Sequence, residues 1–321
     1  MKQTQKQGVI HVLLMGRLGN NMFQYAFARA LQKKFYPNYR IAVNVSYFQR
    51  ARETLKLSGL EDHLHDFCID DVIYEDTHPH KVRTFPQWCL GALGKFVFNA
   101  SGLRNMNTDV KFFQPLYNFF GIYQPASTGI YIEPRIAHSR NIVMKGFFQH
   151  TKFFDDIRDI LLDEFTPKYD VLPHNTEFLR KIKESESVCL TIRRGEFLNM
   201  SLFNVCNEEY FITAMKAIRE ELPDCKFFVF SDDVEDVKKN MHFPFDVEYE
   251  RGNDPVWEKL RLMYSCKHFI ISNSTFSWWA QYLGRSPNKI CYAPIPWLND
   301  STEKFEGLYL PYMRIIECHN N

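Results

Sequence analysis

Two adjacent arginines end an apolar, strand-like run and carry the chemistry of an anion-binding site. Arg193 and Arg194 close the run 187–193. Because side chains alternate along a strand, two neighbouring arginines cannot both enter one apolar core. One of them is expected to reach the crevice above the strand ends, where ligands of open α/β sheets bind, and to pair there with phosphate oxygens. A salt bridge to a nearby carboxylate at the strand end explains the pattern equally well.

A second group of polar residues lies where another strand passes into a helix. The string 272–279 reads Ser-Asn-Ser-Thr-Phe-Ser-Trp-Trp. Helix capping explains Ser274 or Thr275, but it does not require so many small hydrogen-bonding side chains together. A helix N-terminus rich in hydroxyl groups suits a diphosphate, because the helix dipole favours negative charge there. We expect Trp278 and Trp279 to pack in the core.

Two further strand ends offer weaker candidates. The turn Gly16–Asn21 joins the apolar run 9–15 to a helical pattern, and its backbone N–H groups could hold an anion or a sugar. It lacks the sequence of a P-loop or of a dinucleotide-binding turn, and a purely structural turn is the commoner case. Asp232, at the end of the run 226–232, could accept hydrogen bonds from a ribose or a base, although helix capping is the more frequent role of such an aspartate.

The elements that must position these residues alternate along the chain. Strand-like runs are expected at 9–15, 39–45, 187–193, 226–232, 268–273 and 289–293. Helical patterns follow the Gly16–Asn21 turn, Asn207 and Pro255, and a further helix is expected over 153–167. Such alternation predicts an α/β protein with parallel sheets. A hinge after residue 165 would divide the chain into domains 1–165 and 166–321; the segment 61–140 receives no clear assignment.

Composition excludes several classes of protein. The 321 residues are 45% hydrophobic, and 39 Lys and Arg against 38 Asp and Glu leave a net charge of +1, which argues against a nucleic-acid partner. Eight cysteines without a CxxC pair, and the histidine pairs His63/His65 and His78/His80 without a third ligand, predict no metal site. The run 9–15 is too short to span a membrane. We expect a cytoplasmic protein, with peripheral association at the inner face of the membrane left open.

Five segments of the chain resemble the α-1,2-fucosyltransferases of glycosyltransferase family 11. GRLGNNMFQYAFARAL (16–31) is similar to the family's GGLGNQMFQYAFA, and LTIRRGEF (190–197) to its HIRRGDY. VFSDD (229–233) and ISNSTFSWWAQYLG (271–284) match its FSDD and SNSTFSWW segments, and GFFQHTKFF (146–154) is similar to its mid-chain GYWQSEKYF. The matches follow the family's order over nearly the whole chain.

The resemblance implies a GT-B-like fold in which two Rossmann-like domains face a donor cleft. Domain 1–165 would be the acceptor side and domain 166–321 would bind GDP-fucose. The implied reaction is an inverting, metal-independent transfer of L-fucose from GDP-β-L-fucose to the 2-hydroxyl of a terminal galactoside on an oligosaccharide acceptor, with no cofactor.

The resemblance also assigns roles to particular residues. Arg193 would hold the donor β-phosphate, Asn20 would lie at the reaction centre, and Glu196 is the candidate general base. Glu196 could equally orient Arg194 or pair with the Gly16–Asn21 turn. The donor-binding residues would be Gly16, Arg17, Gly19, Arg194, Asp232, Asn273, Ser274, Thr275, Phe276 and Ser277.

Four positions depart from the family pattern. Arg17 replaces a glycine and Asn21 a glutamine, while Thr191 stands in place of a histidine and Glu196 in place of an aspartate. The last two changes motivate an alternative hypothesis, a non-catalytic relative that binds sugar nucleotides or glycans.

Overall fold

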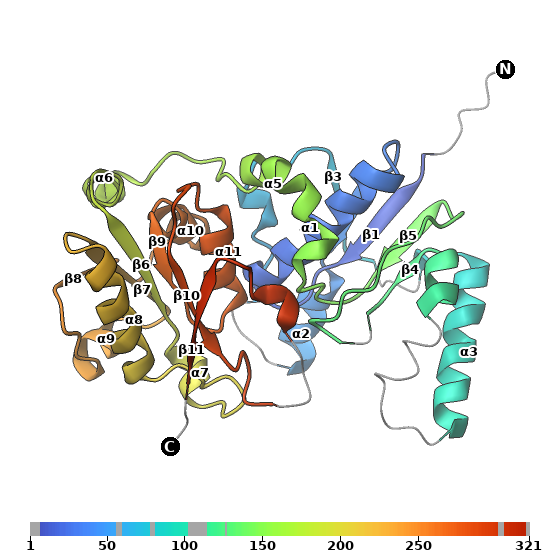
Figure 1. The fold of residues 1–321 in the computed structure, drawn as a ribbon. Coiled ribbons are helices and arrows are strands. Elements are labelled where there is room, and N and C mark those ends of the chain that lie inside the picture. The colour runs from blue at the N-terminus through green and yellow to red at the C-terminus, as the bar shows by residue number, and fades with distance from the viewer. Residues whose placement is uncertain are drawn as a thin grey trace. The chain divides into compact units, whose positions relative to one another are not determined.

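The computed structural model describes residues 7–55, 60–77, 81–101, 114–125, 127–300 and 305–318. Contacts within the chain divide it into two units (Figure 1). The first comprises the described residues of Met1–Phe165 and Lys304–Leu308, and the second those of Thr166–Glu303 and Tyr309–Asn321. Each unit is built on a parallel sheet, as the alternation of strands and helices predicts.

The sheet of the first unit has the strand order β3-β2-β1-β5-β4, and all its pairings are parallel. Its strands are β1 (Val9–Leu13), β2 (Arg40–Asn44), β3 (Val72–Glu75), β4 (Ile122–Tyr123) and β5 (Asn141–Met144). Its α-helices include α1 (Leu18–Phe35), α2 (Ser46–Leu55), α3 (Phe85–Ser101) and α5 (Arg158–Glu164). Parallel neighbours place the C-terminal ends of β1 and β5 at the same edge, where the Gly16–Asn21 turn begins.

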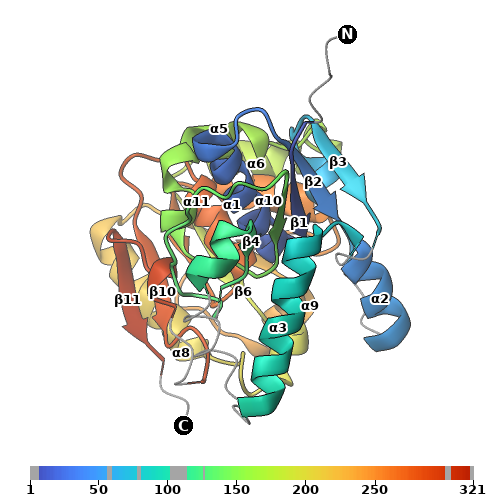
Figure 2. The ribbon, with the colours of Figure 1, turned by 90° about the vertical axis from the view of Figure 1, so that its right-hand side faces the viewer.

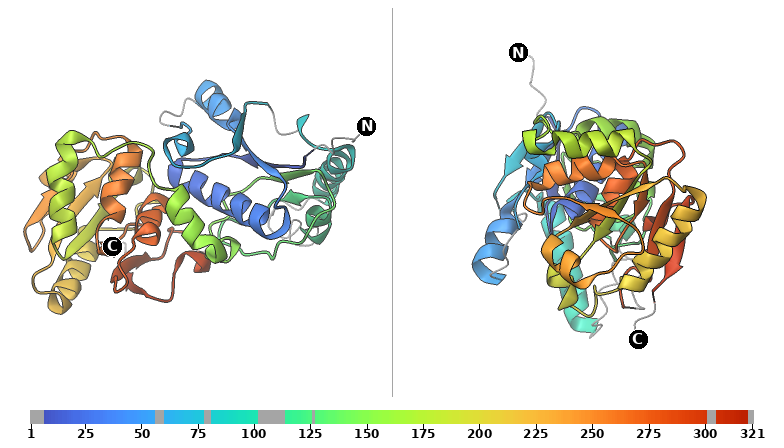
Figure 3. Two further views of the ribbon diagram at one scale, coloured as in Figure 1. Left: turned by 90° about the horizontal axis from the view of Figure 1, so that it is seen from above. Right: turned by 90° about the vertical axis from the view of Figure 1, so that its left-hand side faces the viewer.

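Aromatic side chains of α1 form much of the first unit's core. The ring of Phe27 lies 4.4 Å from that of Phe153 and 4.8 Å from that of Phe148, measured between centroids. Glu164 of α5 accepts hydrogen bonds from the Tyr25 hydroxyl (2.8 Å) and from Arg29 Nε (2.7 Å), which fixes α5 beside α1 (Figure 3).

The second unit contains a six-stranded parallel sheet of order β11-β10-β9-β6-β7-β8. Its strands are β6 (Ser187–Ile192), β7 (Lys226–Ser231), β8 (Val247–Tyr249), β9 (His268–Ile270), β10 (Cys291–Ile295) and β11 (Met313–Glu317). Its α-helices are α6 (Thr176–Glu184), α7 (Gly195–Leu198), α8 (Glu208–Glu221), α9 (Val234–Asn240), α10 (Val256–Tyr264) and α11 (Thr275–Leu283). β6 lies in the middle of the sheet, between β9 and β7, and all six of its residues are buried.

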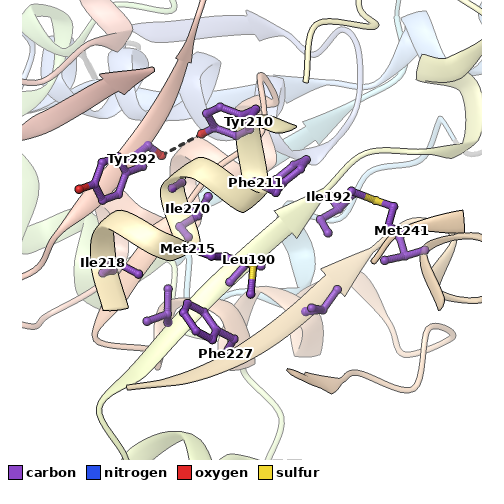
Figure 4. Close-up of a cluster of buried hydrophobic side chains, with 14 of the residues drawn as sticks. Leu190, Ile192, Tyr210, Phe211, Met215, Ile218, Phe227, Met241, Ile270 and Tyr292 are labelled. Carbon is purple, nitrogen blue, oxygen red and sulfur yellow. Dashed lines mark hydrogen bonds between the residues drawn. The ribbon is translucent and has the colours of Figure 1, made fainter. Parts of the chain in front are cut away.

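A hydrophobic cluster joins α8 to the central strands (Figure 4). Leu190 of β6, Met215 of α8 and Phe227 of β7 are each at most 1% exposed. The Tyr210 hydroxyl, buried in this cluster, donates to the carbonyl oxygen of Ile271 at 2.6 Å and lies 3.3 Å from that of Tyr292. This contact satisfies backbone groups at the end of β9, the strand that leads into the string 272–279.

The predicted fold class is confirmed: the chain is α/β, and each of its two units is Rossmann-like, with a parallel sheet and helices. All six expected strands are present, and Asn207 and Pro255 precede α8 and α10 as expected. The helix expected over 153–167 is wrong in its first half, where short 3-10 turns precede α5. Phe154 is fully buried with φ −150°, a backbone conformation that no α-helix accepts, and its ring packs against Phe23.

Strands β3, β4, β5, β8 and β11 were not expected from the sequence. They have two to five residues each, and four of them, β3, β4, β8 and β11, lie at sheet edges. Among the helices of the described residues, none combines the length and the apolar character needed to cross a membrane.

Candidate active site

The two arginines after β6 lie in a corner formed by the ends of β6 and β7. Arg193 Nη2 lies 3.3 Å from Asp232 Oδ2, and its guanidinium stands 4.6 Å from the centre of the Phe197 ring. A carboxylate and an aromatic face therefore hold one cation from two directions. The Arg193 side chain remains 19% exposed, so its charge is only partly withdrawn from solvent.

Asp232 also fixes the backbone of this corner. Its Oδ1 accepts a hydrogen bond from the Arg194 N–H at 2.8 Å. A Cβ atom on Gly195 would lie 2.8 Å from Asp232 Oδ2, so a larger residue there would displace the carboxylate. One aspartate thus ties the end of β7 to the turn that follows β6.

Arg194 pairs with a different carboxylate. Its Nε donates to Asp236 of α9, and this hydrogen bond lowers the pKa of Asp236. The capping role belongs to the neighbouring Asp233, whose Oδ1 accepts from the Asp236 N–H at 3.0 Å. The salt-bridge interpretation of the arginine pair is therefore observed. Phosphate binding stays a prediction, and so does a role of Glu196 in orienting Arg194.

A buried ion pair holds the end of β7 in place beside the two arginines. Glu250 Oε1 accepts from the Ser231 N–H at 3.0 Å and lies 3.0 Å from Lys259 Nζ. Lys259 donates in turn to the carbonyl oxygens of Ser231 (3.1 Å) and Gly252 (2.9 Å). Burial raises the pKa of Glu250, and the Lys259 ammonium opposes that effect. Sequence reasoning missed both residues, because neither lies in a motif and their contact joins β8 to α10.

Hydrogen bonds hold the beginning of the string 272–279 in place. Thr191 Oγ1 accepts from the Ser272 N–H at 3.0 Å, and the hydroxyl oxygens of Ser272 and Ser277 are 3.1 Å apart. Asn273 Nδ2 donates to the carbonyl oxygens of Phe203 (2.9 Å) and Trp297 (3.0 Å). The side chains of Ser272, Asn273 and Ser277 therefore order the loops around α11.

The remaining residues of the string form the N-terminal turn of α11. Ser274 is the N-cap residue, and its carbonyl oxygen accepts from the Trp278 N–H at 2.9 Å. Thr275 and Phe276 are half-buried, so they are the most accessible side chains of the string. The two tryptophans are fully buried, as expected. Because β9, β6 and β7 are adjacent and parallel, their C-terminal ends bring this turn, the arginines and Asp232 to one edge of the sheet.

Glu196 lies in the short helix α7, which begins directly after Arg194. It is exposed, and its carbonyl oxygen accepts from the Asn199 N–H. Its carboxylate thus keeps the access to solvent that a group exchanging protons with a substrate requires.

The first unit holds the Gly16–Asn21 turn with neutral amides. Gly16 has φ +78°, and a Cβ atom there would lie 2.3 Å from Asn20 Nδ2, so the turn requires glycine. The Arg17 carbonyl oxygen accepts from the N–H groups of Asn20 (2.9 Å) and Asn21 (3.1 Å). Gly19 is buried and Arg17 is exposed. Gln149 Nε2 donates to Asn20 Oδ1 at 2.9 Å, which fixes the orientation of the Asn20 amide.

A second amide network lies beneath the same turn. Asn21 Nδ2 donates to the Met15 carbonyl oxygen at 3.1 Å and lies 3.3 Å from Gln24 Oε1. Gln24 Nε2 donates to the Gly146 carbonyl oxygen at 3.0 Å. Gln24 and Gln149 are functional supports that sequence reasoning missed. Their signal is a glutamine within an aromatic run, which in a folded chain must find buried hydrogen-bond partners.

The histidine pairs were not expected to bind metal. His63 and His65 pair with neighbouring aspartates, His63 Nδ1 lying 3.4 Å from Asp66 Oδ2, whereas His78 and His80 lie outside the described residues. Within the part of the chain that the structure describes, no three His, Cys, Asp or Glu side chains are grouped so that they could hold a metal ion.

Comparison with known proteins shows to which family the chain belongs. The model of the family "Glycosyl transferase family 11" matches residues 130–313. The chain is 33% identical to the α-1,2-colitosyltransferase of Escherichia coli over 304 residues, which cover 90% of this chain and 92% of that protein. It is 26% identical to the O-antigen biosynthesis glycosyltransferase WbnK of Escherichia coli, over 88% of this chain and 93% of that protein.

A solved structure is also similar. The fucosyltransferase NodZ from Bradyrhizobium aligns with 86% of this chain and 92% of its own, with a TM-score of 0.49 and 12% identity. The family match and the colitosyltransferase establish that the chain belongs to glycosyltransferase family 11.

The buried ion pair of Glu250 and Lys259 leads to a prediction about the pH dependence of stability. Replacing Lys259 by Met should leave an uncompensated carboxylate and lower the free energy of unfolding by about 3–5 kcal/mol at neutral pH. A carboxyl group whose pKa is raised by folding loses stability as pH rises from its unfolded through its folded pKa. The loss should therefore be larger at about pH 8 than at about pH 5, as measured by denaturant unfolding.

The matched control is Lys181→Met, which removes a half-exposed ion pair with Glu248 (2.7 Å) and should cost less than about 1 kcal/mol at either pH. Equal losses in the two variants, or no dependence on pH for Lys259→Met, would contradict the assigned role of the buried pair.

Proposed function

We propose that this glycosyltransferase moves L-fucose from GDP-β-L-fucose to the 2-hydroxyl of a terminal galactoside, with inversion and in α-1,2 linkage. The observation that carries the proposal is the Arg193 corner at the end of β6, beside the N-terminal turn of α11, in a chain of family 11. Arg193 would hold the β-phosphate of the donor and stabilise the negative charge that develops as GDP departs.

The held geometry of Arg193 supports this role. Asp232 and Phe197 fix the guanidinium before any donor arrives, so little reorganisation is needed when the phosphate binds. The remaining donor contacts are proposed at Arg194, Asp232, Ser274, Thr275 and Phe276. Asn273 and Ser277, whose side chains bond within the protein, would act by ordering the start of α11.

The first unit is proposed to carry the acceptor, with Asn20 as its reacting-centre residue. The amide of Asn20 is oriented by Gln149, as a group that must meet one substrate hydroxyl requires. Gly16, Arg17 and Gly19 shape the same turn. Glu196 is proposed to take the proton from the acceptor hydroxyl as the new bond forms.

A non-catalytic, sugar-nucleotide-binding relative is the second candidate, and Thr191 bears on it. The side chain of Thr191 is 3% exposed and holds the Ser272 N–H. Thr191, in place of the family's histidine, therefore has a structural role, and the contacts of Arg193 are present beside it. This supports the hypothesis of an active enzyme over that of a non-catalytic relative.

Turnover is the direct test of the proposed function. The purified chain, incubated in EDTA with GDP-fucose and β-galactosides, should release GDP and form a fucosylated product, because the arginines and α11 are proposed to offset the diphosphate charge without a metal. GDP-colitose serves as the second donor, since colitose is the sugar in the name of the 33%-identical relative. Turnover with GDP-colitose alone would overturn the donor assignment, and GDP binding without turnover of either donor would indicate the non-catalytic alternative. Loss of activity in EDTA that Mg²⁺ or Mn²⁺ restores would contradict the hypothesis that the transfer needs no metal ion.

Arg193→Ala should lower the rate of transfer by about 10²–10³, the usual cost of removing one preorganised group at a developing charge. Arg193→Lys should recover only part of it, because the two-pronged contact is lost. Arg180→Ala, at an exposed arginine of α6 paired with Glu177, is the matched control and should keep full activity. Near-normal turnover of a folded Arg193→Ala protein, as judged by circular dichroism, would remove the assignment.

Glu196→Gln separates two roles of this carboxylate. If Glu196 is the general base, kcat should fall by about 10²–10⁴ while GDP binding, measured by calorimetry, stays the same. A parallel fall in GDP affinity would instead show that Glu196 acts on the donor side. A variant with full turnover would exclude both roles.

A further inference from the structure

The segment between β6 and α8 carries the aromatic ring that lies against Arg193. It comprises residues 195–204, begins with the single turn of α7, and leads to Asn207, the N-cap of α8. Figure 2 shows α8 beside β11, so the chain beyond the segment is joined to the six-stranded sheet. We call residues 195–204 the β6–α8 segment.

The β6–α8 segment buries little apolar surface. Its side chains Leu198, Met200 and Leu202 are 39%, 45% and 37% exposed. Its one helical turn is much shorter than a helix that is stable by itself. The order of the segment therefore depends on the contacts that its two phenylalanines and its backbone make with the rest of the second unit.

The two phenylalanines of the segment pack on each other. The rings of Phe197 and Phe203 have their centres 5.2 Å apart and their planes tilted by 32°, and both side chains are half-buried. The Arg193 guanidinium stands 4.6 Å from the centre of the Phe197 ring. Because aromatic pairs and cation–π pairs are directional, a change at Phe203 reaches the guanidinium through Phe197.

The backbone of Phe203 contacts the other part of the candidate active site. Its carbonyl oxygen accepts a hydrogen bond from Asn273 Nδ2 at 2.9 Å, two residues before α11 begins at Thr275. The same oxygen accepts from the N–H of Val205 at 2.9 Å, and Val205 belongs to the hydrophobic core. One residue is therefore connected by its ring to Arg193 and by its backbone to the start of α11.

Asn299, in the loop after β10, holds the backbone on both sides of Phe203. Its N–H donates to the carbonyl oxygen of Leu202 at 3.0 Å. Its Nδ2 donates to the carbonyl oxygens of Ser201 (2.7 Å) and Asn204 (3.0 Å). An exposed side chain that satisfies two carbonyl oxygens of a neighbouring segment fixes the path of that segment.

We propose that Phe203 is a positioning residue of the transfer reaction. Its ring keeps Phe197 against Arg193, and its carbonyl oxygen keeps Asn273 at the start of α11. The inference rests on the proposed role of Arg193 at the donor β-phosphate. A misplacement of about 1 Å can cost about 10²-fold in rate, so a residue that acts only through Phe197 can still change turnover. Asn299 acts in the same way, through the backbone of the segment.

The test is a double-mutant cycle between Phe203 and Arg193. Phe203→Leu removes the aromatic contact and keeps the carbonyl oxygen, and it should lower kcat by about 3–10-fold. In the Arg193→Ala background the same replacement should change kcat by less than about twofold, because the group that Phe203 positions is absent. Phe203→Tyr keeps the ring and should recover most of the rate.

The same cycle is measured on GDP affinity by calorimetry, which requires no turnover. Phe203→Leu should weaken GDP binding by about threefold or more only where Arg193 is present. Absence of transfer from GDP-fucose would contradict the proposed function, whereas the cycle on GDP affinity would still decide this inference. Asn299→Ala, which leaves both rings in place, should lower kcat in the same direction.

Phe245 offers a matched control in the same unit. Its ring is stacked on that of Phe227 at 5.7 Å, and the Arg219 guanidinium lies 4.6 Å from its centre. Phe227 is at the beginning of β7, whereas Asp232 follows the end of that strand. Phe245→Leu should therefore leave kcat and GDP affinity unchanged per folded molecule, as judged by circular dichroism.

Equal effects of Phe203→Leu in the two Arg193 backgrounds would overturn the proposal, because a general loss of structure acts on both alike. Unchanged kcat and GDP affinity in a folded Phe203→Leu protein would overturn it as well.

Discussion

The carboxylate of Asp232 is the contact on which the rest of the candidate active site depends. It accepts a backbone hydrogen bond after β6 and pairs with Arg193, while its own position is set by the end of β7. Two parallel strands are thereby joined beyond their last ladder hydrogen bond. Glu250 and Lys259 form a second ion pair at the end of β7, where both contact the backbone of Ser231. This pair is almost completely buried. Because Asp232 pairs with Arg193 and Glu250 pairs with Lys259, these two cations stay ordered at the sheet edge without a bound ligand.

The two units fix their strand-to-helix turns by different physical means. In the second unit the groups are charged, which suits a corner that is proposed to meet a diphosphate. In the first unit Asn20, Asn21, Gln24 and Gln149 form a network of neutral amides around Gly16. Amides bond with a defined direction and impose no net field, which suits contact with the hydroxyl groups of a sugar.

The chain belongs to glycosyltransferase family 11 and departs from that family's pattern at four positions. The strongest departure from the family pattern, Thr191, proves to be an internal hydrogen-bond acceptor for the start of the string 272–279. The side chains of Asn273 and Ser277 also form hydrogen bonds within the protein. Part of the motif that the sequence predicts to bind the donor therefore orders the start of α11. Arg193, Arg194, Asp232, Thr275 and Phe276 are candidate donor contacts whose side chains stay partly accessible.

The sequence by itself determined the α/β class, the six expected strands, the caps at Asn207 and Pro255, and the segments that carry the site, because each of these follows from local periodicity or a local motif. It could not show that Asp236 pairs with Arg194, or that Glu250, Lys259, Gln24 and Gln149 support the turns. Nor could it show the short strands of the sheets or the break before α5. Those features join residues far apart in the chain, and burial and pairing energies that arise only after the strands align decide them.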